Sequence, residues 1–204
     1  MKLWLVRHAQ PLVDAGICYG RLDLAADAAA TTECARQLVS VLPAGIRVRT
    51  SSLQRCEQLA QALQALRPDL AYKVDSRLAE MDFGCWEGRA WNAIGQEELQ
   101  AWTDDFACYA AGRDGESVTG FMARVASVFD ELGSGTLTPA LSRGEREEEW
   151  GSDTVWITHA GVIRAAQLLA RGIRRLEHAG QWPRDAPNYG QWRTLDLHPA
   201  ASTK

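Results

Sequence analysis

Short hydrophobic runs alternate along the chain with longer stretches in which hydrophobic residues recur every three or four positions. The short runs are typical of buried strands and lie at residues 2–6, 46–50, 71–74 and 153–158. Helical spacing predicts helices over residues 26–42, 53–66, 121–132 and 162–170. Strands that alternate with helices predict an α/β fold: a mostly parallel central sheet with helices on both faces.

The ends of these elements carry weaker signals. Ser51 and Ser52 precede the second helix and are expected to act as its N-caps. Residues 195–197 resemble a last edge strand.

Two stretches lack a clear pattern. For residues 78–115 the sequence predicts irregular to helical structure, which forms either a lobe or a lid over the functional site. Residues 133–152 are poor in hydrophobic residues and dense in glycine, serine and charge, so we expect a flexible insertion there. We expect the whole chain, residues 1–204, to form a single domain.

Composition narrows the choice of partners. The net charge of −4, from 22 basic and 26 acidic residues, argues against general binding to nucleic acid or to anionic membranes. No hydrophobic run approaches the ~20 residues of a membrane helix, and the apolar N-terminal run is too short for a signal peptide. We therefore expect a cytoplasmic protein with a small-molecule substrate. Monomer and homodimer both stay open.

The metal-ligating residues are scattered. Five cysteines include no Cys-x-x-Cys pair, and four histidines include no His-x-x-x-His pattern. This distribution predicts reduced thiols, and neither a metal site nor a cofactor.

Two histidines each follow a predicted strand. His8 comes after the first run and His159 after the last, and the carboxyl ends of parallel strands share one edge of the sheet. A lone histidine there is often structural. Arg7 changes that expectation, because its guanidinium suits phosphate oxygens and a neutral imidazole beside it can attack phosphorus.

Further candidates lie between the histidines. Arg55 falls in the first turn of a predicted helix, where an anion is already favoured. Three carboxylates, Glu80, Asp82 and Glu87, lie close together in the sequence, and charge alone does not show which of them could give a proton to a leaving oxygen.

Four segments resemble, in the same order, motifs of the histidine phosphatase (phosphoglycerate mutase-like) superfamily: residues 7–8, 51–56, 78–88 and 158–164. The resemblance implies a three-layer αβα sandwich and a phosphohistidine on His8. It also implies that Arg7, Arg55 and His159 bind the phosphate and that Glu80 is the acid.

The chain departs from these motifs in places. Ala9-Gln10-Pro11 replaces a typical Gly-Glu-Thr, and Asp14 stands where an asparagine often binds phosphate, so that role is not transferred. Arg21 either binds a second anionic group of the substrate or is surface charge. Residues 115–117 resemble a Gly-Glu-Ser segment, for which we expect capping rather than chemistry.

The resemblance implies metal-independent hydrolysis of phosphomonoesters, with alpha-ribazole phosphatase-type members, enzymes of cobalamin biosynthesis, the most similar. A cofactor-dependent phosphoglycerate mutase is the first alternative. A non-catalytic phosphate-binding or interaction module is the second, and the eight tryptophans would fit it.

Overall fold

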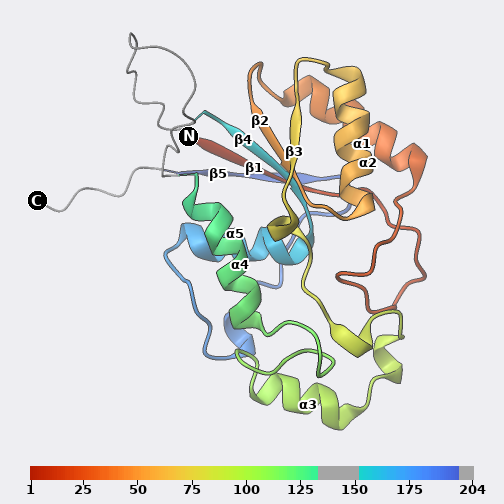
Figure 1. Cartoon of the computed structure of the whole chain (residues 1–204), viewed down its shortest axis with the longest axis vertical. Coiled ribbons are helices and arrows are strands. Elements are labelled where there is room, and N and C mark those ends of the chain that lie inside the picture. Colours follow the sequence, from red (N-terminus) through yellow and green to blue (C-terminus); the bar gives the residue numbers. More distant parts are fainter. Residues whose placement is uncertain (133–151, 198–204) are drawn as a thin grey trace, which may run out of the picture.

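The centre of the protein is a five-stranded sheet with the order β3-β2-β4-β1-β5 (Figure 1). The computed structural model describes residues 1–132 and 152–197. The strands are β1 (Lys2–Arg7), β2 (Arg47–Thr50), β3 (Tyr72–Val74), β4 (Thr154–Thr158) and β5 (Trp192–Asp196). Neighbouring strands are parallel, except that β5 runs antiparallel to β1. The expected mostly parallel sheet is confirmed.

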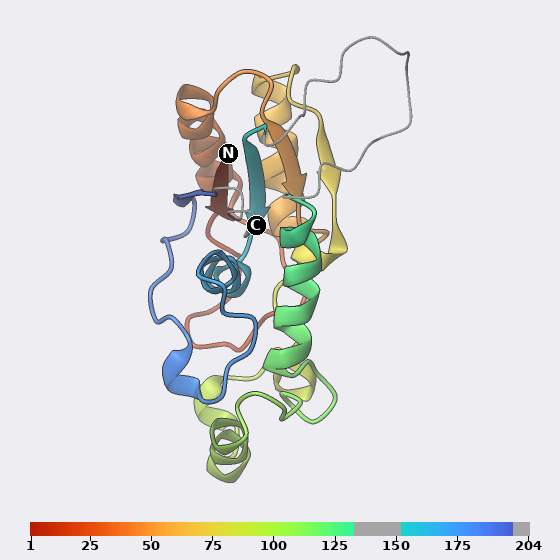
Figure 2. The same cartoon turned by 90° about the vertical axis from the view of Figure 1, so that its left-hand side faces the viewer.

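Helices cover both faces of this sheet (Figures 1 and 2). They are α1 (Ala28–Val41) and α2 (Gln54–Leu66) on one face, and α4 (Val118–Asp130) and α5 (Ala160–Ala170) on the other. Alternation along the strands fills the two cores. In β4, Val155 and Ile157 belong to the core under α1 and α2, whereas Trp156 belongs to the core under α4 and α5.

Some predicted boundaries were wrong. The last strand begins at Trp192 and ends at Asp196, earlier than predicted, because it pairs with β1 from Val6 back to Lys2. Neither Ser51 nor Ser52 caps α2. Its N-cap is Leu53, which offers no side-chain bond, and the Ser51 hydroxyl contacts His159 in the core instead.

Residues 78–115 form a lobe. The part of this lobe that lies farthest from the sheet in Figure 1 is α3 (Gln96–Asp104). The core of the lobe is a cluster of edge-to-face and tilted aromatic rings: Phe83, Trp86, Trp91, Trp102 and Phe106. A role for this lobe as a lid stays a prediction.

The predicted insertion at 133–152 lies outside the described residues, apart from Ser152. No helix within 1–132 or 152–197 is long and apolar enough to cross a membrane.

Candidate active site

The two histidines meet because of the strand register. Arg7 pairs with Thr158 where β1 runs parallel to β4, so the next residues, His8 and His159, leave the sheet side by side. Their ring centroids are 5.1 Å apart. Arg55, in the first turn of α2, comes to the same edge. The structure thus brings His8, His159 and Arg55 together at one edge of the sheet, and their roles at this site stay predictions.

His8 is held as a neutral base. Its side chain is only 2% exposed, and its Nδ1 lies 2.7 Å from the carbonyl oxygen of Ala9. A carbonyl can only accept, so the ring proton is on Nδ1 and the lone pair is on Nε2. Burial lowers the pKa of His8 to about 3, and the charges of Arg55 and Arg7 act in the same direction. His8 therefore presents an uncharged, nucleophilic nitrogen.

The two arginines beside His8 retain donors for an anion. Arg55 is fully buried and donates to the carbonyl oxygens of Gly20, at 2.6 Å, and Leu22, at 2.8 Å. Arg7 donates to a backbone carbonyl at 3.0 Å, and its guanidinium carbon lies 3.9 Å from the centre of the Tyr189 ring. The Nε atoms of both are buried without a partner among the described residues. Buried donors of this kind favour a bound anion.

His159 is also neutral. It is fully buried, and its pKa is lowered well below the usual value by burial and by the charge of Arg55. Its Nε2 lies 2.8 Å from Ser51 Oγ, which already accepts the Leu53 N–H at 3.2 Å. The Cys56 Sγ lies 3.4 Å from Nε2 and 4.0 Å from Nδ1. Ser51 and Cys56 thus fix the orientation of the His159 ring beside His8.

Glu80 is fixed against the start of α5. Its Oε2 accepts the Gly161 N–H at 2.9 Å, and its Oε1 accepts the Met81 N–H at 3.0 Å. A Cβ at position 161 would lie only 2.1 Å from Oε1, so a larger residue there would push the carboxylate away. Since Gly161 follows His159 by two residues, Glu80 is held next to the histidine pair.

The structure separates Glu80 from its two competitors. Asp82 pairs with Arg21 at 3.3 Å and accepts the Gly84 N–H. Glu87 accepts backbone N–H groups of the loop that carries Gly20 and Leu22. Both carboxylates therefore organise loops, which leaves Glu80 as the candidate acid.

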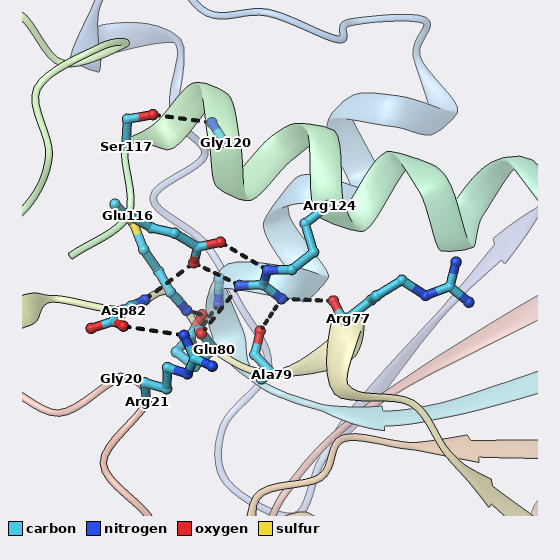
Figure 3. Close-up of polar contacts among 12 residues, drawn as sticks. Gly20, Arg21, Arg77, Ala79, Glu80, Asp82, Glu116, Ser117, Gly120 and Arg124 are labelled. Carbon is cyan, nitrogen blue, oxygen red and sulfur yellow. Dashed lines mark hydrogen bonds and ion pairs between the residues drawn. The ribbon is translucent and has the colours of Figure 1, made fainter.

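A buttress of charged groups holds the Glu80 loop (Figure 3). Arg124 donates to the carbonyl oxygens of Arg77, Ala79 and Glu80 at 2.7, 2.9 and 3.3 Å. It also pairs with Glu116 at 2.7 Å. The expected capping role of segment 115–117 is confirmed, because Ser117 caps α4 by accepting the Gly120 N–H.

Two other candidates stand apart. The Arg21 side chain is 67% exposed and is directed at Asp82 rather than at the histidines. Asp14 is exposed. A substrate contact by Arg21 stays a prediction.

Sequence reasoning gave no role to three groups near the site. The Tyr19 and Tyr189 hydroxyls are 2.6 Å apart, and Tyr189 stacks at 5.6 Å from His8. Arg164, on α5, has a buried Nε. No pattern pairs the two tyrosines, which lie 170 positions apart, whereas Arg164 belongs to the motif at 158–164.

The comparisons with known proteins agree with this geometry. The family model described as the histidine phosphatase superfamily (branch 1) matches residues 3–188. The chain belongs to this superfamily. A search of curated proteins found no match. Among the described residues, no group of three or more His, Cys, Asp or Glu side chains is placed to hold a metal ion.

Solved structures extend the likeness over the chain. TTHB049 from Thermus thermophilus is 25% identical with a TM-score of 0.66, over 98% of this chain and 95% of that one. Mycobacterial glucosyl-3-phosphoglycerate phosphatase is 25% identical with a TM-score of 0.64, over 83% and 78%. An Escherichia coli K-12 protein proposed as an alpha-ribazole-5'-P phosphatase is 23% identical with a TM-score of 0.74, over 97% and 91%, and shows the fold alone. The protein is a phosphatase of this superfamily.

The low pKa of His8 predicts how the stability of the phosphatase depends on pH. Between pH 6.5 and about 3 the unfolded chain binds a proton that the folded chain does not, so stability falls as the pH drops through this range. At about pH 5 this costs roughly 2 kcal/mol. In urea unfolding, the free energy of unfolding of wild type should fall between about pH 7.5 and about pH 5. That of His8→Gln should fall by about 2 kcal/mol less over the same range.

The matched control is His178→Gln, because His178 is exposed. This variant should follow the wild-type pH dependence. Equal losses in wild type and His8→Gln would contradict the prediction.

Proposed function

We propose that the phosphatase hydrolyses phosphomonoesters through a phosphohistidine on His8, without a metal ion. The observation that carries this proposal is the free Nε2 of a neutral His8 beside two arginines with unused buried donors. A nucleophile and an anion site are thereby held at one point, before substrate binds.

In the first step His8 Nε2 attacks phosphorus and the ester P–O bond breaks. Arg7 and Arg55 offset charge on the phosphoryl oxygens, and a ring N–H of His159 donates to one of them. Glu80 gives its proton to the departing oxygen, which leaves as the alcohol.

In the second step water attacks the phosphohistidine. The Glu80 carboxylate takes a proton from that water, the P–N bond breaks, and inorganic phosphate and neutral His8 are restored. The same carboxyl serves as acid and then as base, because Gly161 holds it in one place throughout.

Candidates for the natural substrate come from the similarity to other proteins and not from the geometry of the site. The resemblance to alpha-ribazole phosphatase-type members makes ribazole phosphate one candidate, and the mycobacterial neighbour makes glucosyl-3-phosphoglycerate another. Turnover of a panel of phosphorylated metabolites that includes both would rank them. A place in cobalamin biosynthesis would follow only from the first.

Replacement of the nucleophile tests the covalent step. His8→Gln should fold but lose turnover of p-nitrophenyl phosphate, measured in EDTA, because no phosphohistidine can form. Acid-labile, base-stable phosphate should be trapped on wild type and on His178→Gln, and should be absent from His8→Gln. Labelling that persists in His8→Gln would identify another nucleophile, and wild type without turnover would favour a non-catalytic module.

Leaving groups test the role of Glu80. The p-nitrophenolate ion leaves without help, whereas an alkoxide needs a proton. Because the later attack by water needs Glu80 with either ester, the first step is measured alone: Glu80→Gln should lose about 10²- to 10⁴-fold in the single-turnover release of glycerol from glycerol 3-phosphate, and far less in the burst release of p-nitrophenolate. Asp82→Asn is the control and should lose little with either substrate. Equal losses of Glu80→Gln with both substrates would assign Glu80 a role other than proton donor.

A direct assay separates hydrolysis from the mutase alternative. A mutase must keep its phosphohistidine from water while the bound intermediate reorients. This needs a closed and strongly cationic site. Here the charge of Arg21 is balanced by Asp82. We expect release of inorganic phosphate to exceed exchange between 3- and 2-phosphoglycerate, even with a bisphosphoglycerate primer. Exchange that outpaces release would favour the mutase.

A further inference from the structure

Arg164 shares one feature with the two proposed phosphate ligands. Its side chain is half-buried, and its Nη2 donates to the carbonyl oxygen of Arg184 at 3.1 Å. Its Nε is buried without a hydrogen-bond partner in the described part of the chain, and the only other arginines there with such an Nε are Arg7 and Arg55. A buried donor without a partner is costly, and the indole N–H groups of Trp4, Trp102 and Trp156 share this state, so the case for a ligand at Arg164 depends on where its guanidinium lies.

The position of Arg164 puts it on the side of the leaving group. Gly161 and Arg164 are three residues apart on α5 and share a helix face. Gly161 holds the carboxylate of Glu80, which faces the departing oxygen in the proposed reaction. Burial lowers the pKa of Arg164, the charge of Arg7 acts in the same direction, and the charges of Glu80 and Asp185 oppose it.

The segment of residues 184–189 contacts both Arg164 and the proposed phosphate site. Arg164 donates to the carbonyl oxygen of Arg184, and Arg7 donates to that of Pro187 and stacks on Tyr189. Both guanidinium groups therefore border the same segment, residues 184–189. A substrate bound along this segment would extend from Arg7 toward Arg164.

Arg164 has no direct ion pair within the described part of the chain. Arg21 and Arg124 have carboxylate partners, whereas no carboxylate within 4.0 Å of Arg164 is found among the described residues, and the charges of Glu80 and Asp185 act on it only from farther away. In the proposed reaction, Arg7 and Arg55 face the phosphate, which leaves the guanidinium of Arg164 for another anionic group.

We propose that Arg164 binds a carboxylate on the alcohol part of the substrate, so that the phosphatase prefers acidic phosphomonoesters. The Nε and one Nη of a guanidinium can hold the two oxygens of a carboxylate at once. The inference rests on the proposed phosphomonoesterase function. It ranks ribazole phosphate, which has no anion on its alcohol part, below a substrate such as a phosphoglycerate.

Two esters of similar size test this inference. They are 3-phosphoglycerate and glycerol 3-phosphate, in which an uncharged CH₂OH replaces the carboxylate. Wild type should show kcat/KM about tenfold or more in favour of 3-phosphoglycerate. Arg164→Met, which keeps the length of the side chain, should lose this preference through KM, with glycerol 3-phosphate little changed. Arg164→Lys should retain part of it.

The control is Arg171→Met, at the exposed end of the same helix, which should keep the wild-type preference. A second readout needs no turnover: calorimetry of both esters with the His8→Gln protein, with and without Arg164→Met. The 3-phosphoglycerate should bind about tenfold more tightly only when Arg164 is present.

The outcomes distinguish a failure of this inference from a failure of the proposed phosphomonoesterase function. Wild type that hydrolyses both esters equally, or an Arg164→Met variant that loses equally on both, would assign Arg164 the structural task of holding segment 184–189 and would overturn the inference alone. Absence of turnover with every ester and with p-nitrophenyl phosphate would overturn the proposed function itself.

Discussion

The buried guanidinium of Arg55 is the constraint on which the rest of the site depends. A charge removed from water must be compensated, and here main-chain oxygens of Gly20 and Leu22 do so. Those oxygens are in place because Glu87 binds N–H groups of the same loop. Burial lowers the pKa of His8 and of His159, and the charge of Arg55 lowers both further. One buried group therefore sets the shape of the loop and the anion site, and helps to keep both histidines neutral.

Much of this arrangement could be predicted from the sequence. Hydrophobic periodicity located the strands, and the rule that parallel strands end at one edge brought His8 to His159. Other parts could not be predicted, because they depend on the path of loops. Ser51 looked like a helix cap, yet its hydroxyl lies in the core on His159. The contact between Tyr19 and Tyr189 joins two loops that share no local pattern.

The three carboxylates at 80, 82 and 87 illustrate the limit of sequence reasoning. They have the same chemistry within eight positions, and their functions differ only through which N–H groups each one meets. The buttress around Glu80 comes from α4, through Arg124 and Glu116. A motif in the sequence marks these residues, but only the folded chain shows that the loop of the acid rests on them.

Most of the contacts that aim the reactive groups are made to the peptide backbone. His8 is oriented by a carbonyl, Arg55 by two carbonyls, and Glu80 by two N–H groups. Peptide groups are the same whatever side chain they carry, so such a scaffold tolerates wide sequence drift as long as the chain keeps its path. This accounts for a fold shared over 98% of the chain with a protein that matches it at one position in four. It also means that insertions beside Gly20 or Gly161 should be rarer than substitutions of their neighbours, while the two glycines themselves leave no room for a Cβ.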